Sequence, residues 1–281
     1  MKKQGFFYLL FLVSFFGLLS CSSNDDPIVI IDDPTDPTDS MNTTNDPRTY
    51  STETHVVGDW GVEIYVPSDY GDQNKYPIIY FNDGDQFADV FGFLTTLEAD
   101  AFIMVGISGS NSRAERFLAY DDPVVSEELG EYTPSASHYS DAIVDEIMPF
   151  VEGKYSIHGN KKAFFGISLG GLHATWMAIK YPQVFNFIGA ISPSYWVANE
   201  ALFQENLDEL VPSGLAAPTT IYFDRGSAEW RNHLSFISLL KTAGLDYGET
   251  LFYLEAVGAD HSPEDWILRI TIPFRLFLEG I

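Results

Sequence analysis

One serine in this sequence stands in a pattern that favours nucleophilic chemistry. Ser168 is the central residue of a G-x-S-x-G pentapeptide at 166–170, with an apolar run before it (163–165) and a helix-like segment after it (172–181). A strand, a tight turn and a helix in this order present the serine hydroxyl at the edge of a sheet. The two glycines fit a turn in which strand and helix pass too closely for a Cβ atom. The pattern therefore predicts that Ser168 attacks a carbonyl carbon.

A serine hydroxyl needs a base within hydrogen-bond reach and an acid that orients the base. In α/β-hydrolases, whose nucleophile lies in a turn of this kind, the partners follow in the chain order serine, acid, histidine. His173 falls inside the following helix, where we expect it to pack, and His233 falls in a later helical segment. His261 lies in a loop after the last apolar strand, where it could swing over Ser168. We predict that His261 is the base; a surface loop histidine is the alternative.

The acid is expected just after the strand-like run 219–223. Asp224 follows it directly and adjoins Arg225, which fits a structural ion pair. Glu229 lies beyond a Gly-Ser turn that could carry its carboxylate towards His261. Glu229 is therefore the first candidate for the orienting role and Asp224 the alternative, and a Ser–His pair without a strong acid is a third reading.

An acyl-transfer site also needs two backbone N–H groups aimed at the developing oxyanion. Leu169, directly after the serine, is the first expected donor. The second should come from the loop after the apolar run 76–81, around Gly84 and Asp85. A glycine there lets the backbone approach a substrate closely.

The elements that must position these residues alternate along the chain. Strand-like runs occur at 52–57, 61–67, 76–81, 101–107, 163–165, 187–191, 219–223 and 250–256, and helix-like patterns at 87–99, 139–155, 172–181, 230–243 and 266–278. Pro273 is expected to kink or break the last helix. Strands alternating with helices predict an α/β fold with a mostly parallel sheet covered on both faces.

One long segment and two tryptophans are candidates for the substrate site. Residues 108–137 are polar and rich in Gly, Ser, Asp and Pro, which predicts an irregular insertion. It follows a strand, so it should lie at the sheet edge where ligands bind in open α/β folds, as a substrate-binding rim. Trp196 and Trp266 are candidates for lining the pocket, with core packing as the alternative.

The N-terminus reads as a leader and a tether. A positive start and a short apolar run predict a signal peptide over residues 1–20, and Leu18-Leu19-Ser20-Cys21 resembles the bacterial lipobox. Cys21 is then the lipidated residue; an ordinary signal peptide is the alternative. Residues 21–49 are acidic and proline-rich, which predicts a disordered tether, and residues 50–281 form the folded domain. The acidic patch after the cysteine resembles export signals of bacterial surface lipoproteins, with a solvated spacer as the alternative.

Composition excludes several other functions. The 281 residues carry a formal net charge of −25, which disfavours nucleic-acid binding because that needs a basic face. The single cysteine allows no disulfide framework or thiolate metal site. The six histidines form no H-x-x-x-H pair, so no metal and no cofactor are expected.

Four stretches together carry a family resemblance. They are 76–85, 166–172, 191–196 and 261–266, and from about Tyr50 to the C-terminus the chain resembles the esterase group of the α/β-hydrolases. That group includes trilactone siderophore esterases, S-formylglutathione hydrolase, and feruloyl and acetyl-xylan esterases. The Asp-Gly-Asp loop and the Ser-Pro-Ser-x-Trp motif look most similar to the siderophore-esterase branch.

The resemblance implies an α/β-hydrolase fold and assigns roles at matching positions. Ser168, Glu229 and His261 take the triad roles, and Leu169 and Asp85 donate backbone N–H groups. It also suggests a substrate-binding arginine in the insertion, either Arg113 or Arg116, with a solvated loop arginine as the alternative for each.

The sequence thus predicts a serine carboxylic ester hydrolase that works through an acyl-enzyme. Its expected substrates are extracellular esters, either siderophore lactones or feruloyl and acetyl esters of polysaccharides. We expect it to be lipid-anchored to the outer membrane, with no other membrane contact. The alternatives are a catalytically silent glycan- or ligand-binding lipoprotein and an acyltransferase that uses a sugar in place of water.

Overall fold

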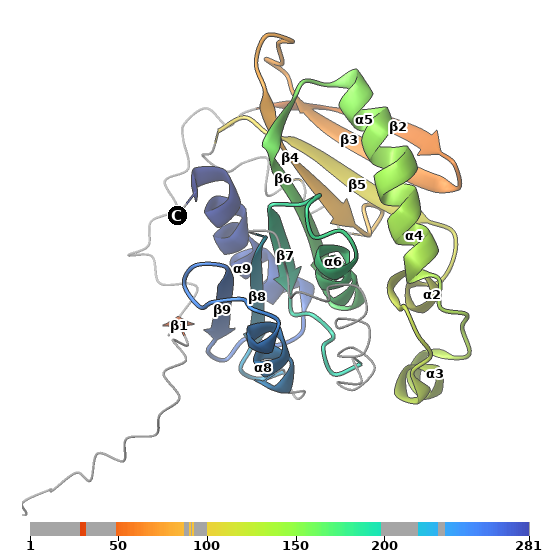
Figure 1. Cartoon of the computed structure of the whole chain (residues 1–281), viewed down its shortest axis with the longest axis vertical. Coiled ribbons are helices and arrows are strands. Elements are labelled where there is room, and N and C mark those ends of the chain that lie inside the picture. The colour runs from red at the N-terminus through yellow and green to blue at the C-terminus, as the bar shows by residue number, and fades with distance from the viewer. Residues whose placement is uncertain are drawn as a thin grey trace, which may run out of the picture.

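A nine-stranded sheet forms the centre of the molecule in the computed structural model (Figure 1). The structure describes residues 29–31, 49–86, 90, 92, 100–197, 219–229 and 234–280. The strands lie in the order β1-β9-β8-β7-β6-β4-β5-β3-β2. Their bounds are β1 Val29–Ile31, β2 Tyr50–Val57, β3 Trp60–Pro67, β4 Tyr76–Asn82, β5 Ile103–Gly109, β6 Ile157–Ile167, β7 Phe187–Ile191, β8 Thr220–Gly226 and β9 Leu251–Ala256.

Most of the sheet is parallel, as the alternation of strands and helices predicts. β2 pairs antiparallel with β3, and β3 pairs antiparallel with β5, while the pairs from β5 through to β1 are parallel. β4 and β7 are buried along their whole length, as strands covered on both faces must be. The α/β-hydrolase fold class is confirmed.

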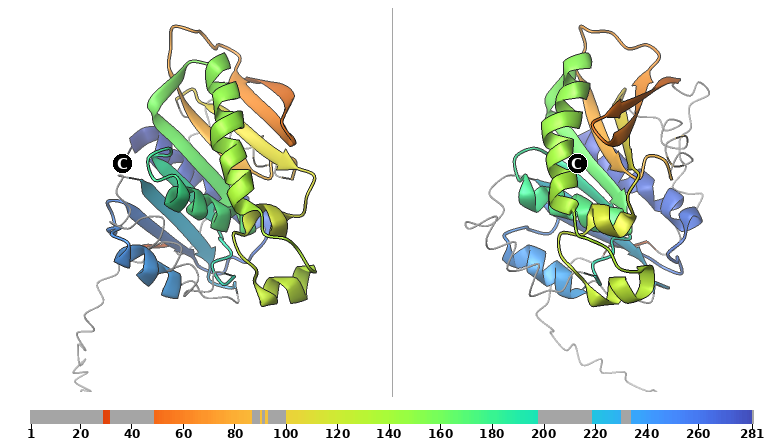
Figure 2. Two further views of the ribbon diagram at one scale, coloured as in Figure 1. Left: turned by 45° about the vertical axis from the view of Figure 1, so that its right-hand side comes forward. Right: turned by 90° about the vertical axis from the view of Figure 1, so that its right-hand side faces the viewer.

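Helices cover both faces of the sheet. On one face lie α4 (Ala136–Ala142), η1 (Ile143–Ile147), α5 (Met148–Lys154), α6 (Leu169–Lys180) and α8 (Leu234–Thr242). On the other lie α9 (Pro263–Arg275) and η2 (Leu276–Gly280), as the edge-on view of Figure 2 shows. Each face of the sheet buries its own apolar cluster, so the strands that end at the site are packed on both sides.

The insertion is more ordered than its composition predicts. Within residues 108–137 the chain forms α2 (Arg113–Phe117) and α3 (Pro123–Leu129). Ser112 caps α2 in a reciprocal capping box with Glu115, and Asp122 caps α3 ahead of a proline at the first turn. Both caps are local signals for the start of a helix, and the overall composition of residues 108–137 does not show them. The prediction of an irregular segment was therefore wrong at these two helices.

Two further elements differ from expectation. Pro273 does not end its helix, since α9 runs on to Arg275 and the chain continues as the π-helix η2. Residues 29–31 fall inside the predicted tether, yet they form β1, which pairs with β9.

The leader, Cys21, the rest of the tether and the helix expected at 87–99, except Val90 and Gly92, lie outside the described residues. His233 also lies outside them. Within the described part of the chain, no helix has the length and apolar character needed to span a membrane.

Candidate active site

The turn between β6 and α6 holds Ser168 in an uncommon backbone conformation. Ser168 has φ 60° and ψ −122° and occupies the N-cap position of α6. A Cβ atom on Gly166 would lie 2.1 Å from the carbonyl oxygen of Gly170, so only glycine lets strand and helix approach this closely. The Ser168 N–H donates to the Ile191 carbonyl of the neighbouring strand at 3.0 Å. The serine is thus held at the carboxyl edge of the sheet in a strained geometry of the kind found at active sites.

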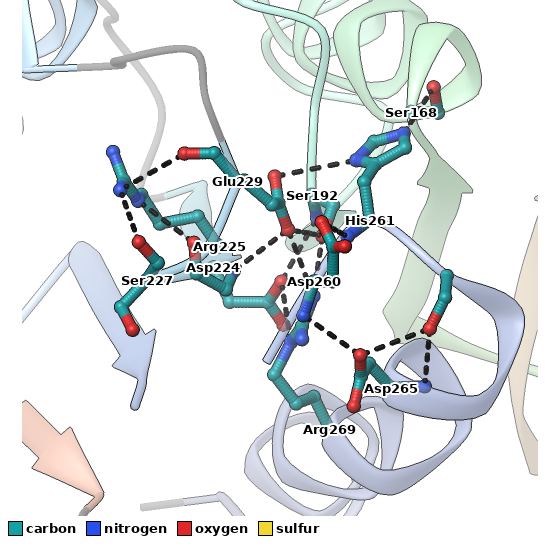
Figure 3. Close-up of polar contacts among 12 residues, drawn as sticks. Ser168, Ser192, Asp224, Arg225, Ser227, Glu229, Asp260, His261, Asp265 and Arg269 are labelled. Atoms are coloured by element: carbon teal, nitrogen blue, oxygen red, sulfur yellow. Dashed lines mark hydrogen bonds and ion pairs between the residues drawn. The ribbon is translucent and has the colours of Figure 1, made fainter. Parts of the chain in front are cut away.

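Three predicted residues meet at this edge in one hydrogen-bonded chain (Figure 3). Ser168 Oγ lies 3.1 Å from His261 Nε2. His261 Nδ1 lies 3.3 Å from Glu229 Oε2. An ionised Glu229 can only accept, so Nδ1 carries the ring hydrogen and Nε2 is left to accept the serine proton. The arrangement fits a nucleophile, a base and an orienting acid.

Glu229 is held as a carboxylate by several donors. Its Oε1 accepts from the Gly226 N–H at 2.7 Å and from the Ser192 hydroxyl at 2.6 Å. Burial alone would raise the pKa of Glu229, but the hydrogen bonds from His261, Gly226 and Ser192 outweigh it and lower the pKa to about 2. A charged Glu229 is therefore ready to stabilise an imidazolium on His261.

Asp224, the alternative acid, does not reach His261. Its Oδ1 accepts from the Ser192 N–H at 2.9 Å and lies 3.3 Å from Nε of Arg269, while Tyr222 OH donates to Oδ2. Burial raises the pKa of Asp224, although Arg269 opposes this. Asp224 thus sits in a structural ion pair, but its partner is Arg269 of α9 and not the adjacent Arg225, which pairs with Glu255.

Close packing of two loops brings the acid to the base. A Cβ atom on Gly226 would lie 2.1 Å from the carbonyl oxygen of Ala259, two residues before His261. The Ala228 N–H donates to that same oxygen at 3.0 Å. The His261 loop then enters α9, whose N-cap residue is Ser262. The glycine of the predicted Gly-Ser turn therefore acts by permitting this approach.

In the loop after β4, Gly84 does not have the oxyanion-binding role that the sequence predicts. The Gly84 N–H already donates to the Ile107 carbonyl at 3.0 Å, and a Cβ atom on Gly84 would lie 2.5 Å from the backbone of Gly106. Gly84 therefore serves the packing of the loop on β5 and does not fit as an oxyanion donor. Asp85 follows it in the turn and is exposed to solvent.

The two candidate arginines are both paired with Asp83. Arg113 donates from Nε and Nη2 to Asp83 Oδ2 at 3.1 and 2.9 Å, and from Nη2 to the carbonyl of Ile167 at 3.1 Å. Arg116 donates to Asp83 Oδ1 at 2.9 Å and to the Gly109 carbonyl at 2.7 Å. Arg116 is only 2% exposed, so it does not face a substrate as predicted. Arg113 is half-buried, and because Asp83 is shared with Arg116, the three side chains together keep one net positive charge.

Trp266, Trp196 and His173 lie in three different environments. Trp266 is buried in the core, and its ring stands at 86° to the His261 ring with centroids 4.9 Å apart. It therefore backs the imidazole and does not line an open pocket. Trp196 is half-buried against the larger core cluster. His173 is fully buried between Asn82 and Ser140, where burial lowers its pKa to about 3, so it packs as predicted.

Three residues at the site escaped the sequence analysis. Ser194 Oγ lies 3.2 Å from Ser168 Oγ, and Ser192 and Arg269 contact Glu229. The two serines belong to the Ser-Pro-Ser-x-Trp motif, which was noticed only as a match. Arg269 follows the 261–266 motif by three residues in α9, but nothing in the sequence points to its contact with Glu229. In the described part of the chain, no group of three or more His, Cys, Asp and Glu side chains could hold a metal ion.

The sheet order and the serine turn define a member of the α/β-hydrolase superfamily. More narrowly, the chain belongs to the esterase family described as "Putative esterase", which it matches over residues 54–271. Two relatives from Bacillus subtilis strain 168 also align with part of it. YbbA is 27% identical over 52% of this chain and 62% of its own length, and YjcH is 28% identical over 46% and 54%. Both matches span less than two thirds of these relatives, which are described as uncharacterized proteins.

Solved structures share the fold at low identity. The BES protein of Bacillus cereus is 20% identical with a TM-score of 0.61, covering 83% of this chain and 94% of that one. An IroE-like serine hydrolase of Shewanella oneidensis is 19% identical with a TM-score of 0.63, covering 82% and 80%. A feruloyl esterase module of Clostridium thermocellum is 17% identical with a TM-score of 0.60, covering 86% and 92%. At these identities the likeness shows the fold alone.

Proposed function

We propose that this protein is a serine carboxylic ester hydrolase that works through an acyl-enzyme on Ser168. One observation carries the proposal: Ser168 Oγ, the His261 ring and the Glu229 carboxylate form a continuous chain with contacts of 3.1 and 3.3 Å. These are the groups and distances that activation of a serine hydroxyl requires.

The reaction follows from this geometry. His261 Nε2 accepts the proton of Ser168 as Oγ attacks the ester carbonyl, and Glu229 stabilises the imidazolium. The same proton passes to the departing alcohol, which leaves the acyl group on Ser168. A water molecule then gives a proton to His261 and attacks the acyl carbon, and His261 returns the proton to Ser168 as the acid leaves. The N–H groups of Leu169 and Asp85 are the proposed donors to the oxyanion in both steps.

The proposal is tested by comparing the wild type with Ser168→Ala in ester hydrolysis and in labelling of the serine. Ser168→Ala should fold like the wild type but lose p-nitrophenyl acetate hydrolysis and labelling by a fluorophosphonate probe. Unchanged turnover in Ser168→Ala would rule out Ser168 as the nucleophile. A wild type that neither labels nor hydrolyses any ester would instead favour a silent glycan- or ligand-binding lipoprotein.

Extracellular esters are the proposed substrates, either siderophore lactones or feruloyl and acetyl esters of polysaccharides. Support comes from structural neighbours named as a siderophore hydrolase and as a feruloyl esterase. Asp83 neutralises only one of Arg113 and Arg116, so this cluster keeps one net positive charge that could favour an anionic substrate. A panel of trilactone siderophore, methyl ferulate, acetylated xylan and p-nitrophenyl esters separates these classes. Adding a sugar acceptor to the same assays tests for acyl transfer.

We also propose that Cys21 carries a lipid anchor to the outer membrane. The support is its place at the end of a leader-like run and its being the single cysteine of the chain. Cys21→Ser should move the protein from the membrane fraction to the soluble fraction of the envelope. Protease treatment of whole cells then reports whether the domain faces outward.

A further inference from the structure

One tripeptide after β7 contacts both ends of the Ser168–His261–Glu229 chain. It is Ser192-Pro193-Ser194, and its two hydroxyls contact the nucleophilic serine and the acid. We infer that the tripeptide positions both: Ser194 hydrogen-bonds the nucleophilic oxygen of Ser168, and Ser192 is a positioning residue that acts through Glu229. This inference rests on the proposed function of Ser168.

Ser194 is fixed next to the nucleophile by more than one contact. Its Oγ lies 3.2 Å from Ser168 Oγ, and its N–H donates to the Ser168 carbonyl at 3.0 Å. The residue is 2% exposed, so bulk water does not compete freely for its hydroxyl. When the Ser168 hydrogen points to His261, lone pairs on Ser168 Oγ remain free to accept from Ser194. That bond fixes the side-chain rotamer of Ser168 for attack.

Ser192 is held in a conformation that needs strong local support. It has φ 41° and is fully buried, and its N–H donates to Asp224 Oδ1 at 2.9 Å. Its hydroxyl donates to Glu229 Oε1 at 2.6 Å and accepts from Arg269. A non-glycine residue at positive φ persists only where its surroundings determine it. Here the surroundings are the ion pair of Asp224 and Arg269, which supports Glu229 through Ser192 and also through the direct contact of Arg269 with Glu229 at 3.4 Å.

Both contacts matter most when charge develops. As the acyl-enzyme breaks down, Ser168 Oγ leaves with the electron pair of its bond to the acyl carbon and takes a proton from His261. A hydroxyl that donates to this oxygen stabilises the charge it carries on leaving. Ser192 keeps the opposite end of the chain, Glu229, aimed at His261 while the imidazolium exists. Loss of either contact should therefore lower kcat more than it raises KM.

The test uses Ser194→Ala and Ser192→Ala in the purified protein, with p-nitrophenyl acetate turnover, fluorophosphonate labelling rate and thermal unfolding as readouts. Each variant is expected to lose about 10- to 100-fold in kcat and in labelling rate, with KM within about threefold, since one hydrogen bond to a charged group is lost. Thr219→Val is the matched control. Its buried hydroxyl donates to Pro182 and Phe185 carbonyls at the opposite edge of the sheet. It should lower the unfolding temperature and leave kcat of the folded enzyme unchanged.

Ser192→Gly guards against misfolding of Ser192→Ala, because glycine tolerates a φ of 41° without strain. It should unfold at a higher temperature than Ser192→Ala and yet show the same loss of kcat. Wild-type kcat and labelling in Ser194→Ala and Ser192→Gly would overturn the inference, as would a loss no larger than that in Thr219→Val. If Ser168→Ala is inactive while these variants behave as wild type, the inference fails and the proposed function stands.

Discussion

At the scale of single residues, two buried carboxylates five positions apart have different surroundings. Glu229 faces His261, and its hydrogen-bond donors hold its pKa at about 2. Asp224 is paired with Arg269, and burial raises its pKa. The difference arises because Gly226 lets the chain turn back against Ala259 before Glu229 is reached. The first carboxylate suits the orienting role, and the second stabilises the loops that carry the site.

Amide substitutions should separate these two roles. Glu229→Gln is expected to lower kcat by about 10⁴-fold, because an amide cannot stabilise an imidazolium, and to lower the free energy of unfolding at neutral pH by no more than about 3 kcal/mol. Asp224→Asn removes the carboxylate beside Arg269 Nε and leaves Arg269 only its contact with Glu229, so it should lower the free energy of unfolding by about 3–5 kcal/mol. Steady-state kinetics and urea unfolding measure both. A larger loss of kcat in folded Asp224→Asn than in Glu229→Gln would reverse the assignment.

Glu229 should also make stability depend on pH. Its pKa is lowered from 4.5 to about 2 on folding, so its stabilisation is fully present above pH 4.5 and is lost as the pH falls towards 2. The effect amounts to at most about 3 kcal/mol. Urea unfolding of the wild type and Glu229→Gln, from pH 6 down to 2.5, measures it. The stability difference between the two proteins should shrink towards acid, and a constant difference would contradict the assignment.

At the scale of elements, one ion-pair cluster joins three parts of the chain. Asp83 belongs to the loop after β4, and Arg113 and Arg116 belong to α2 of the insertion. Arg113 also donates to the carbonyl of Ile167, one residue before Ser168, the proposed nucleophile. The insertion is therefore tied to both the expected oxyanion loop and the serine turn. Its arginines fix this geometry, and the sequence had suggested that they bind substrate.

Removing the shared carboxylate should release this connection. Asp83→Asn leaves two guanidinium groups without their partner, so we expect a loss of about 3–5 kcal/mol in the free energy of unfolding, with a fall in kcat. Glu115→Gln is the matched control, since the carboxylate of this half-buried residue completes the cap of α2. It should cost less than about 1 kcal/mol. Equal unfolding free energies for the two variants would argue against the cluster.

The approach of β6 to α6 gives a second test at this scale. Gly166→Ala places a methyl group 2.1 Å from the Gly170 carbonyl, so α6 must shift, and we expect both stability and activity to fall sharply. Gly159→Ala changes the same strand at a position with nothing within 4 Å. It should alter stability by no more than about 1 kcal/mol. Thermal unfolding of the pair measures the difference, and equal unfolding temperatures would show that the turn is not close-packed.

At the scale of the whole molecule, net charge is the dominant property. A formal charge of −25 means that the compact state carries appreciable self-repulsion. Salt screens this repulsion, with a Debye length of about 30 Å at 0.01 M and about 10 Å at 0.1 M. We expect the unfolding temperature to rise by several degrees between 0.01 and 0.5 M potassium chloride. A fall over this range would mean that attractive ion pairs, such as those of Asp83, outweigh the repulsion.

The sequence by itself determined the fold class and pointed to the residues that the site assembles. Apolar runs indicate burial directly, so the strands from β2 to β9 were predicted to within a few residues, except that β6 begins six residues before its predicted run, in a half-buried and exposed stretch that gives no apolar signal. The pentapeptide around Ser168 sets its own backbone geometry through Gly166. Chain order narrowed the base to His261, because its place after the last strand is a property of topology.

The choice among neighbouring candidates needed the tertiary structure. The sequence favours Glu229 over Asp224 but leaves both open, and the packing of Gly226 on Ala259 decides that Glu229 faces His261. Arg116 has a structural role because it pairs with Asp83, 33 positions away in the chain. Asp224 has one because it pairs with Arg269. Residues that lie far apart in the chain make these pairs, and neither composition nor spacing encodes a contact between them. Ser168 was apparent from its local pattern, whereas the polar network that supports it exists only once the strands are side by side.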